Sequence, residues 1–215
     1  MDAPPRLSFL SYAVNGSGLG HLVRQVAIQR WLRRYCAFCG TRSAHWFLTT
    51  SEADSLLHHE GFEQLVDPGR PVPTASTKIH GITPDMLQGQ PDIRSVLGAF
   101  HAYAQDTVLV AHNAAFDMRF LQLKEADTGL AFDQPVLDTL LLSDLVHPQQ
   151  ESHGLEALAQ RLGVQIVGRH TALGDAIVTA EVFLKLVPLL ADKGIHTLGQ
   201  AREAAQKSRF ARVQY

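Results

Sequence analysis

The first sixty residues alternate between apolar runs and stretches with the spacing of an amphipathic helix. An apolar run over residues 7–14 predicts a strand, and a glycine-rich turn follows it at 15–21. Apolar side chains then recur about every 3.6 positions through 22–34, which predicts a helix. A second apolar run at 45–50 and a short stretch at 52–59 predict a further strand and helix. The segment therefore has the pattern of a βαβα unit.

The rest of the chain continues this alternation of strands and helices. The short apolar run at 107–111 is typical of a strand in the middle of a buried parallel sheet. A loop rich in Pro, Thr and Ser is expected at 71–83. Such alternation predicts a three-layer α/β fold with helices on both faces of one sheet. The predicted strands are 62–66, 107–111 and 135–137, and the predicted helices are 84–87, 91–103, 114–126, 139–146, 154–162, 171–190 and 198–207.

Composition narrows the class of protein without identifying it. Of the 215 residues, 46% are hydrophobic and 19% are charged, which is enough apolar material for a globular core. The net charge of −2 excludes a global positive field that would attract nucleic acid. No run of about 18 apolar residues and no signal peptide is recognised, so a cytoplasmic protein without membrane contact is expected. Cys36 and Cys39 form one Cys-x-x-Cys with no second pair, which is typical of a helix end rather than a zinc site.

Two acidic residues stand near the starts of predicted helices, and the second has a histidine close by. Asp117 follows the strand 107–111, and Asp175 follows His170 by five positions. Carboxylates with a nearby histidine suit metal-assisted hydrolysis of a phosphodiester. Acidic residues in a first helical turn are also favoured by the helix dipole, so each one alone has a purely structural interpretation. Asn113 is expected to cap the helix of Asp117 with its side chain. Phe116, Phe120 and Leu121 are expected to anchor that helix in the core.

Asp138 stands at the end of another predicted strand. Two interpretations are open for it: a cap for the following helix, which we favour, or a residue that supports the metal ligands from behind.

Four segments resemble the DEDDh 3′–5′ exonucleases, the superfamily of the polymerase III epsilon-type proofreading domain. The resemblance covers 62 to the C-terminus and implies a ribonuclease H-like core. It implies that Asp117 and Asp175 are metal-binding acids and that His170 is the general base. Two divalent ions, Mg²⁺ or Mn²⁺, would bridge the scissile phosphate. The segments that carry the resemblance are 62–69, 76–83, 112–117 and 170–175.

The resemblance also assigns contacts with the substrate. His80, Thr83 and Asn113 would lie near the bound nucleotide. The substrate would be a 3′ end of single-stranded DNA or RNA, from which nucleoside monophosphates are removed, and a DNA polymerase is a possible partner. The basic, aromatic tail 207–212 has two interpretations, a contact with the nucleic-acid backbone or a solvated terminus, and the second is favoured.

The first acidic motif of this superfamily, Asp-x-Glu at the end of the first strand, is missing from the sequence. The nearest substitutes are Glu52 and Asp54, which also fit a solvated first helical turn. The antiparallel strands that usually precede residue 62 are also expected to be absent. Strands taken from the N-terminal segment would then stand in their place, in a parallel arrangement with the wrong geometry for the first motif.

Residues 1–60 instead resemble the start of a GT-B glycosyltransferase. The resemblance rests on 12–25, which contains the glycine-rich loop Gly16–His21, and on 46–54. The donor half of such an enzyme has no counterpart in this sequence. We therefore divide the chain into a Rossmann-like segment, 1–60, and an exonuclease-like domain, 61–215. The functional hypotheses are a 3′–5′ exonuclease, a catalytically inactive nucleic-acid-binding module, and a sugar-nucleotide-binding fragment.

Overall fold

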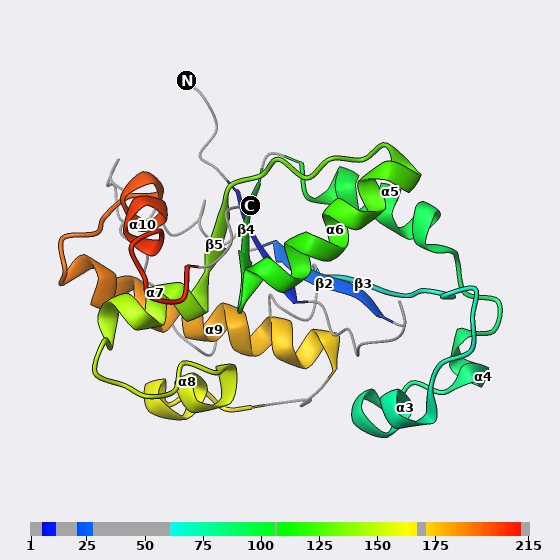
Figure 1. Ribbon diagram of the computed structural model, residues 1–215, viewed down its shortest axis with the longest axis horizontal. Helices are drawn as coiled ribbons and strands as arrows, with labels where there is room; N and C mark the ends of the chain where they lie inside the picture. The colour runs from blue at the N-terminus through cyan, green and yellow to red at the C-terminus, as the bar shows by residue number, and fades with distance from the viewer. Residues whose placement is uncertain (1–5, 12–20, 28–60, 106, 167–170, 212–215) are drawn as a thin grey trace, which may run out of the picture.

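A five-stranded mixed sheet runs through the described part of the protein (Figure 1). The computed structural model describes residues 6–11, 21–27, 61–105, 107–166 and 171–211. Within these residues the strand order is β3-β2-β1-β4-β5. None of the helices found there is long and apolar enough to cross a membrane.

The sheet joins an antiparallel half to a parallel half at its central strand. β1 (Arg6–Ser11) pairs antiparallel with β2 (His21–Ala27), which pairs antiparallel with β3 (Gly61–Leu65). On its other side, β1 is parallel to β4 (Thr107–Ala111), and β4 is parallel to β5 (Val136–Asp138). The carboxyl ends of β1, β4 and β5 therefore meet at one edge, where α/β proteins usually bind their ligands.

Helices surround this sheet, and two short ones lie apart from it at one end of the molecule (Figure 1). Those two are α3 (Thr74–His80) and α4 (Pro84–Leu87). The helix α3 lies inside the segment 71–83, in which the sequence predicted a loop, so it was missed, whereas α4 coincides with the helix predicted at 84–87. The helices of the described residues are α3 (Thr74–His80), α4 (Pro84–Leu87), α5 (Ile93–Tyr103), α6 (Ala114–Thr128), α7 (Thr139–Val146), α8 (Leu155–Leu162), α9 (Ala172–Ala191) and α10 (Leu198–Ala205).

Alternate side chains of β4 separate the core into two clusters. Leu109 and Ala111 pack with the buried residues of α5 and α6. Val108 and Val110 face the other way and pack with α7, α8, α9 and α10. Successive residues of a strand point to opposite faces, so a strand covered on both sides must be apolar throughout. The predicted three-layer α/β architecture is thus confirmed.

The prediction for the segment after residue 21 was wrong. A helix was expected over 22–34, but His21–Ala27 is the strand β2. Leu22 and Val26 are four positions apart, a spacing that places two side chains on one side of either a helix or a strand. Pairing with both β1 and β3 decides the outcome in favour of the strand.

The expectation that the antiparallel strands would be missing was also wrong. β1 and β2 run antiparallel, not as the parallel strands of a βαβ unit. The strand predicted at 45–50 and the helix predicted at 52–59 lie outside the described residues. The division of the chain at residue 60 stays a prediction.

Candidate active site

A single carboxylate organises the edge of the sheet where β4 and β5 end. Asp138 is buried, with an exposed fraction of 4%. Its Oδ1 accepts a hydrogen bond from the backbone N–H of Leu140 (2.9 Å), which caps α7 as predicted. The same carboxylate accepts the N–H groups of Asn113 and Ala114, each at 2.9 Å. Asp138 therefore fixes the turn that leads from β4 into α6.

Asn113 reaches that turn in an unusual backbone conformation. Its φ of 60° and ψ of 49° lie in the left-handed region, which asparagine tolerates better than most residues. The predicted side-chain cap was wrong, because the side chain of Asn113 makes no capping hydrogen bond. The backbone N–H is held by Asp138 instead, and the exposed side chain lies at the edge of a cavity.

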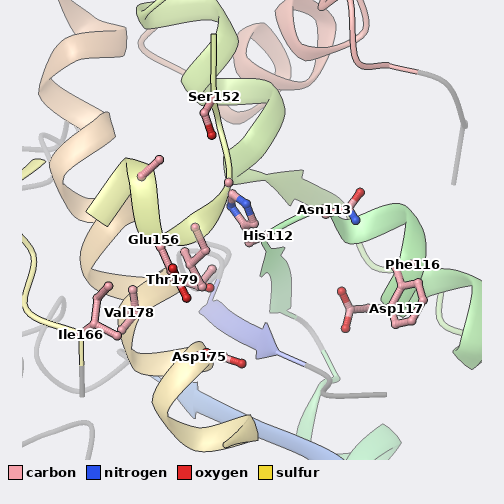
Figure 2. Close-up of a pocket in the computed structure, with 13 residues that line it drawn as sticks. His112, Asn113, Phe116, Asp117, Ser152, Glu156, Ile166, Asp175, Val178 and Thr179 are labelled. Carbon is pink, nitrogen blue, oxygen red and sulfur yellow. The ribbon is translucent and has the colours of Figure 1, made fainter. Parts of the chain in front are cut away.

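The two acids expected to act together do line the same cavity, which has a volume of about 530 Å³. Asp117 lies in the first turn of α6 with an exposed fraction of only 5%. Asp175 lies in the first turn of α9, whose N-terminus is capped by the Thr171 hydroxyl accepting from Gly174 N–H (3.0 Å). Figure 2 shows the two carboxylates reaching into this space from different helices. The fold thus brings together residues that lie far apart in the sequence.

His112 also lines this cavity, and its hydrogen bond to Thr139 sets the tautomer of its ring. The Thr139 hydroxyl donates to the carbonyl oxygen of Ala111 (3.2 Å), so it must accept the hydrogen bond from His112 Nδ1 (2.9 Å). Nδ1 therefore carries the ring proton, and Nε2 is a hydrogen-bond acceptor. Burial, with a smaller contribution from the charge of His153, lowers the pKa of His112 from 6.5 to about 4. At neutral pH the imidazole is uncharged.

Other cavity residues were missed by the sequence. Ser152, Glu156 and Thr179 add polar groups to the lining. Glu156 lies in the first turn of α8, and an acidic residue at that position gave no signal beyond the helix dipole. No pattern in the sequence places these three residues beside Asp117, because they come from separate segments that only the packing of α8 and α9 brings near α6.

Phe116 differs from its prediction. It was expected to anchor α6 in the core together with Phe120 and Leu121. Leu121 is buried as expected, but Phe116 is 43% exposed and lines the cavity. Its ring packs edge-to-face on Phe120, with the two ring centroids 5.1 Å apart. Successive side chains of a helix point in directions about 100° apart. Because Asp117 points inward, its neighbour Phe116 lies along the edge of the cavity.

The remaining predicted residues lie elsewhere in the fold or outside the described residues. His80 is the buried last residue of α3, and its Nδ1 accepts the N–H of Ile82 (3.0 Å). Burial lowers the pKa of His80. Neither His80 nor Thr83, which precedes α4, is among the described residues that line the cavity. Their contact with a nucleotide stays a prediction.

Three further candidates fall outside the described residues: His170, Glu52 and Asp54. The same holds for the glycine-rich loop up to residue 20, although His21 itself begins β2.

The donor set of the cavity suits a hard divalent cation but is incomplete by itself. Asp117 and Asp175 offer carboxylate oxygens, the ligands that Mg²⁺ and Mn²⁺ prefer. In the described ranges no three His, Cys, Asp or Glu side chains come together to hold an ion. A bound ion would therefore need further oxygen atoms from water, from a substrate phosphate, or from the part of the chain that is not described.

The fold defines the protein class, which is that of ribonuclease H-like α/β proteins. Residues 49–183 match the exonuclease family (RNase_T), and the chain belongs to that family. The matched span contains Asp117, His170 and Asp175, and the resemblance to DEDDh exonucleases is confirmed. Members of this family generally use divalent metal ions.

Relatives and solved structures agree with this assignment. A "DNA polymerase III subunit epsilon-like protein" of Rhodobacter capsulatus is 51% identical over 150 residues, which cover 69% of this chain and 21% of that protein. The "DNA polymerase III PolC-type" of Halalkalibacterium halodurans is 36% identical over 152 residues, which cover 70% of this chain and 11% of that protein. The chain thus spans about a fifth or less of the length of these two relatives.

The fold is shared with solved exonucleases. "Exonuclease X in complex with 5' overhanging duplex DNA" superposes with a TM-score of 0.58 at 20% identity, covering 93% of this chain and 99% of that one. A full-length 3′-exonuclease superposes with a TM-score of 0.63 at 13% identity, covering 89% of this chain and 62% of that one.

Proposed function

We propose that this protein hydrolyses phosphodiester bonds at the 3′ ends of single-stranded DNA or RNA. The observation that carries the proposal is the meeting of Asp117 and Asp175 on one cavity, in a chain that belongs to the exonuclease family. Two divalent ions, Mg²⁺ or Mn²⁺, would supply the activation of water and the stabilisation of the leaving oxygen.

The residues of the chain would divide the work of binding and proton transfer. Asp117 and Asp175 would hold the ions, since both present carboxylate oxygens to the cavity. His170 would take the proton of the attacking water, a role for which an imidazole suits neutral pH. His112 cannot share that role well, because a base with a pKa of about 4 accepts protons poorly near pH 7. Asn113 would contact the nucleotide from the edge of the cavity, with His80 and Thr83 beyond it.

Two partners follow from this proposal: exposed 3′ ends as substrate, and a DNA polymerase as the protein whose products are corrected. The two relatives named above are an epsilon-like and a PolC-type polymerase III protein.

A second candidate function is nucleic-acid binding without hydrolysis. It is favoured by the missing first acidic motif: β1 and β2, with the sequences RLSFLS and HLVRQVA, contain no carboxylate. Two acids give an ion fewer protein ligands than a stable octahedral site prefers. In that case the cavity would bind a strand end but leave it intact.

The test is degradation of a 5′-labelled single-stranded oligonucleotide in Mn²⁺, in Mg²⁺ and in EDTA. We expect a ladder of shortened products in metal only, abolished by Asp117→Asn and by His170→Ala. Asp127→Asn is the matched control, because Asp127 lies on the same helix, is exposed, and pairs with Lys124 at 3.2 Å. Binding of the oligonucleotide without any shortening would replace the first proposal with the second. If the protein neither bound nor shortened the oligonucleotide, both proposals would be refuted.

A further inference from the structure

The C-terminal segment 208–211 folds back onto a buried carboxylate. Asp144 of α7 has an exposed fraction of 7%. Its Oδ2 accepts hydrogen bonds from the Ser208 hydroxyl (2.8 Å) and from the Arg209 backbone N–H (3.3 Å). Its Oδ1 lies 3.0 Å from Arg209 Nε. The basic tail, for which a solvated terminus was favoured, is therefore docked through three polar contacts with one residue.

Arg209 also contacts the loop that precedes α8. One of its terminal nitrogens donates to the carbonyl oxygen of Gln150 (2.9 Å), and the guanidinium lies over the Phe210 ring, 4.9 Å from the centroid. Phe210 in turn packs edge-on against the ring of His153, with a centroid distance of 5.5 Å. Arg209 thus links Asp144 to the loop through polar contacts, and Phe210 packs against the loop at His153.

That loop forms one wall of the candidate active site. Ser152 and Gly154 line the cavity, and the first turn of α8 continues the wall with Glu156. His153 between them points the other way: it is 4% exposed, and its Nδ1 lies 2.8 Å from the Ser143 hydroxyl. The same short stretch of backbone, 150–154, therefore lines the cavity and contacts the tail.

Three polar contacts hold this stretch in place. The carbonyl oxygen of Ser152 accepts from Arg161 (2.7 Å), that of Gln150 accepts from Arg209, and His153 is bound to Ser143. Burial lowers the pKa of His153, so its imidazole is neutral near pH 7 and the cation in contact with Asp144 is Arg209. A buried carboxylate needs such a partner, because an uncompensated charge is costly in the interior.

We propose that Arg209 is a positioning residue for the cavity wall 152–156, and that nucleic-acid affinity depends on the docked tail. This inference rests on the proposed function for its consequence. It concerns a segment that lies beyond residues 49–183, the span that matches the family. The contacts of Arg209 place it behind the wall, so it acts on the substrate through residues 152–156 and not by direct contact.

The expected signature separates binding from chemistry. Loosening this wall should weaken the binding of the nucleic acid, whereas Asp117 and Asp175, which lie on other helices, keep their positions. Arg209→Met retains the apolar stem and removes the side-chain contacts with Asp144 Oδ1 and the Gln150 carbonyl oxygen, while the backbone N–H of residue 209 still donates to Asp144. It should raise the KM for a single-stranded oligonucleotide about fivefold to tenfold, as expected for the loss of one or two hydrogen bonds, and change kcat less than about twofold.

The experiment compares Arg209→Met, Arg209→Lys and a matched control, Arg202→Met, in the full chain. Arg202 is an exposed arginine of α10 outside this network. The measurements are KM and kcat in Mn²⁺, and amide hydrogen exchange over 150–157. Arg209→Met should raise exchange there about tenfold, Arg209→Lys should restore part of the protection, and Arg202→Met should change neither measurement.

The two arms keep this inference separate from the proposed function. Unchanged exchange over 150–157 in Arg209→Met would overturn the positioning role, whatever the enzyme does. Raised exchange with an unchanged KM, or with kcat falling as far as affinity, would overturn the link to substrate binding. If the unaltered protein neither binds nor shortens the oligonucleotide, the proposed function and that link fail together, and the exchange arm alone still decides whether Arg209 holds the wall.

Discussion

Replacing Asp138 would remove the hydrogen-bond acceptor that three backbone N–H groups share. Those groups belong to Asn113, Ala114 and Leu140, all at 2.9 Å from the carboxylate. Asp138→Ala leaves these N–H groups without an acceptor at a buried position, since Asp138 has an exposed fraction of only 4%. The change therefore tests whether one side chain anchors both the β4–α6 turn and the start of α7.

The magnitude follows from the strength of hydrogen bonds to a charged group, about 1.5–3 kcal/mol each. Three such bonds would sum to more than about 4 kcal/mol, but water can enter the space left by the carboxylate and recover a part. We expect Asp138→Ala to lower the free energy of unfolding by about 3–5 kcal/mol and Tm by on the order of 10 °C. Asp138→Asn should cost about half as much, since its oxygen can still accept while its NH₂ group opposes the N–H of Ala114.

The assay is urea and thermal unfolding followed by circular dichroism, with Asp92→Ala as the control. Asp92 is also an aspartate N-cap, but it is exposed, and its side chain accepts the backbone N–H of Ser95 at 2.9 Å. Its replacement should shift the unfolding transition much less. If Asp138→Ala proved no more damaging than Asp92→Ala, the three hydrogen bonds would not organise this edge of the sheet.

Two further predictions concern a histidine and two glycines. Since the pKa of His112 is about 4 when folded and 6.5 otherwise, the unfolded chain binds more protons between these values, and stability is lost as pH falls from about 6.5 to 4. Between pH 7.5 and pH 4.5, the unfolding free energy of His112→Gln should fall by on the order of 2 kcal/mol less than that of the unaltered protein. The same fall in both proteins, measured by urea titration at each pH, would contradict this. Gly163 ends α8 at a φ of 68° with nothing within 4 Å of an added Cβ, whereas Gly98 lies inside α5 in equally open space. Gly163→Ala should therefore destabilise by about 1 kcal/mol and Gly98→Ala stabilise by roughly 0.5–1 kcal/mol, and equal shifts of Tm would refute the conformational argument.

The sequence alone determined those features that depend on local pattern and short motifs. The apolar run at 107–111 required cover on both faces, and it became β4, a strand covered on both faces in a three-layer fold. Asp138 at a strand end predicted a cap, which Leu140 confirms. Asp117 and Asp175 could be paired from the sequence because their motifs identify a superfamily in which such acids meet.

Tertiary contacts decided the features that local pattern left open. The segment after residue 21 has apolar spacing that suits a helix or a strand, and only pairing with β1 and β3 made it β2. Phe116 has the apolar character of a core residue, yet it is exposed and lines the cavity beside the buried Asp117. Arg209 looked solvated because its partner, Asp144, lies 65 positions away on a helix that the tail meets only after the chain has folded. For β2 and Arg209 the deciding partners, β3 and Asp144, are distant in sequence, and a local pattern carries no record of them.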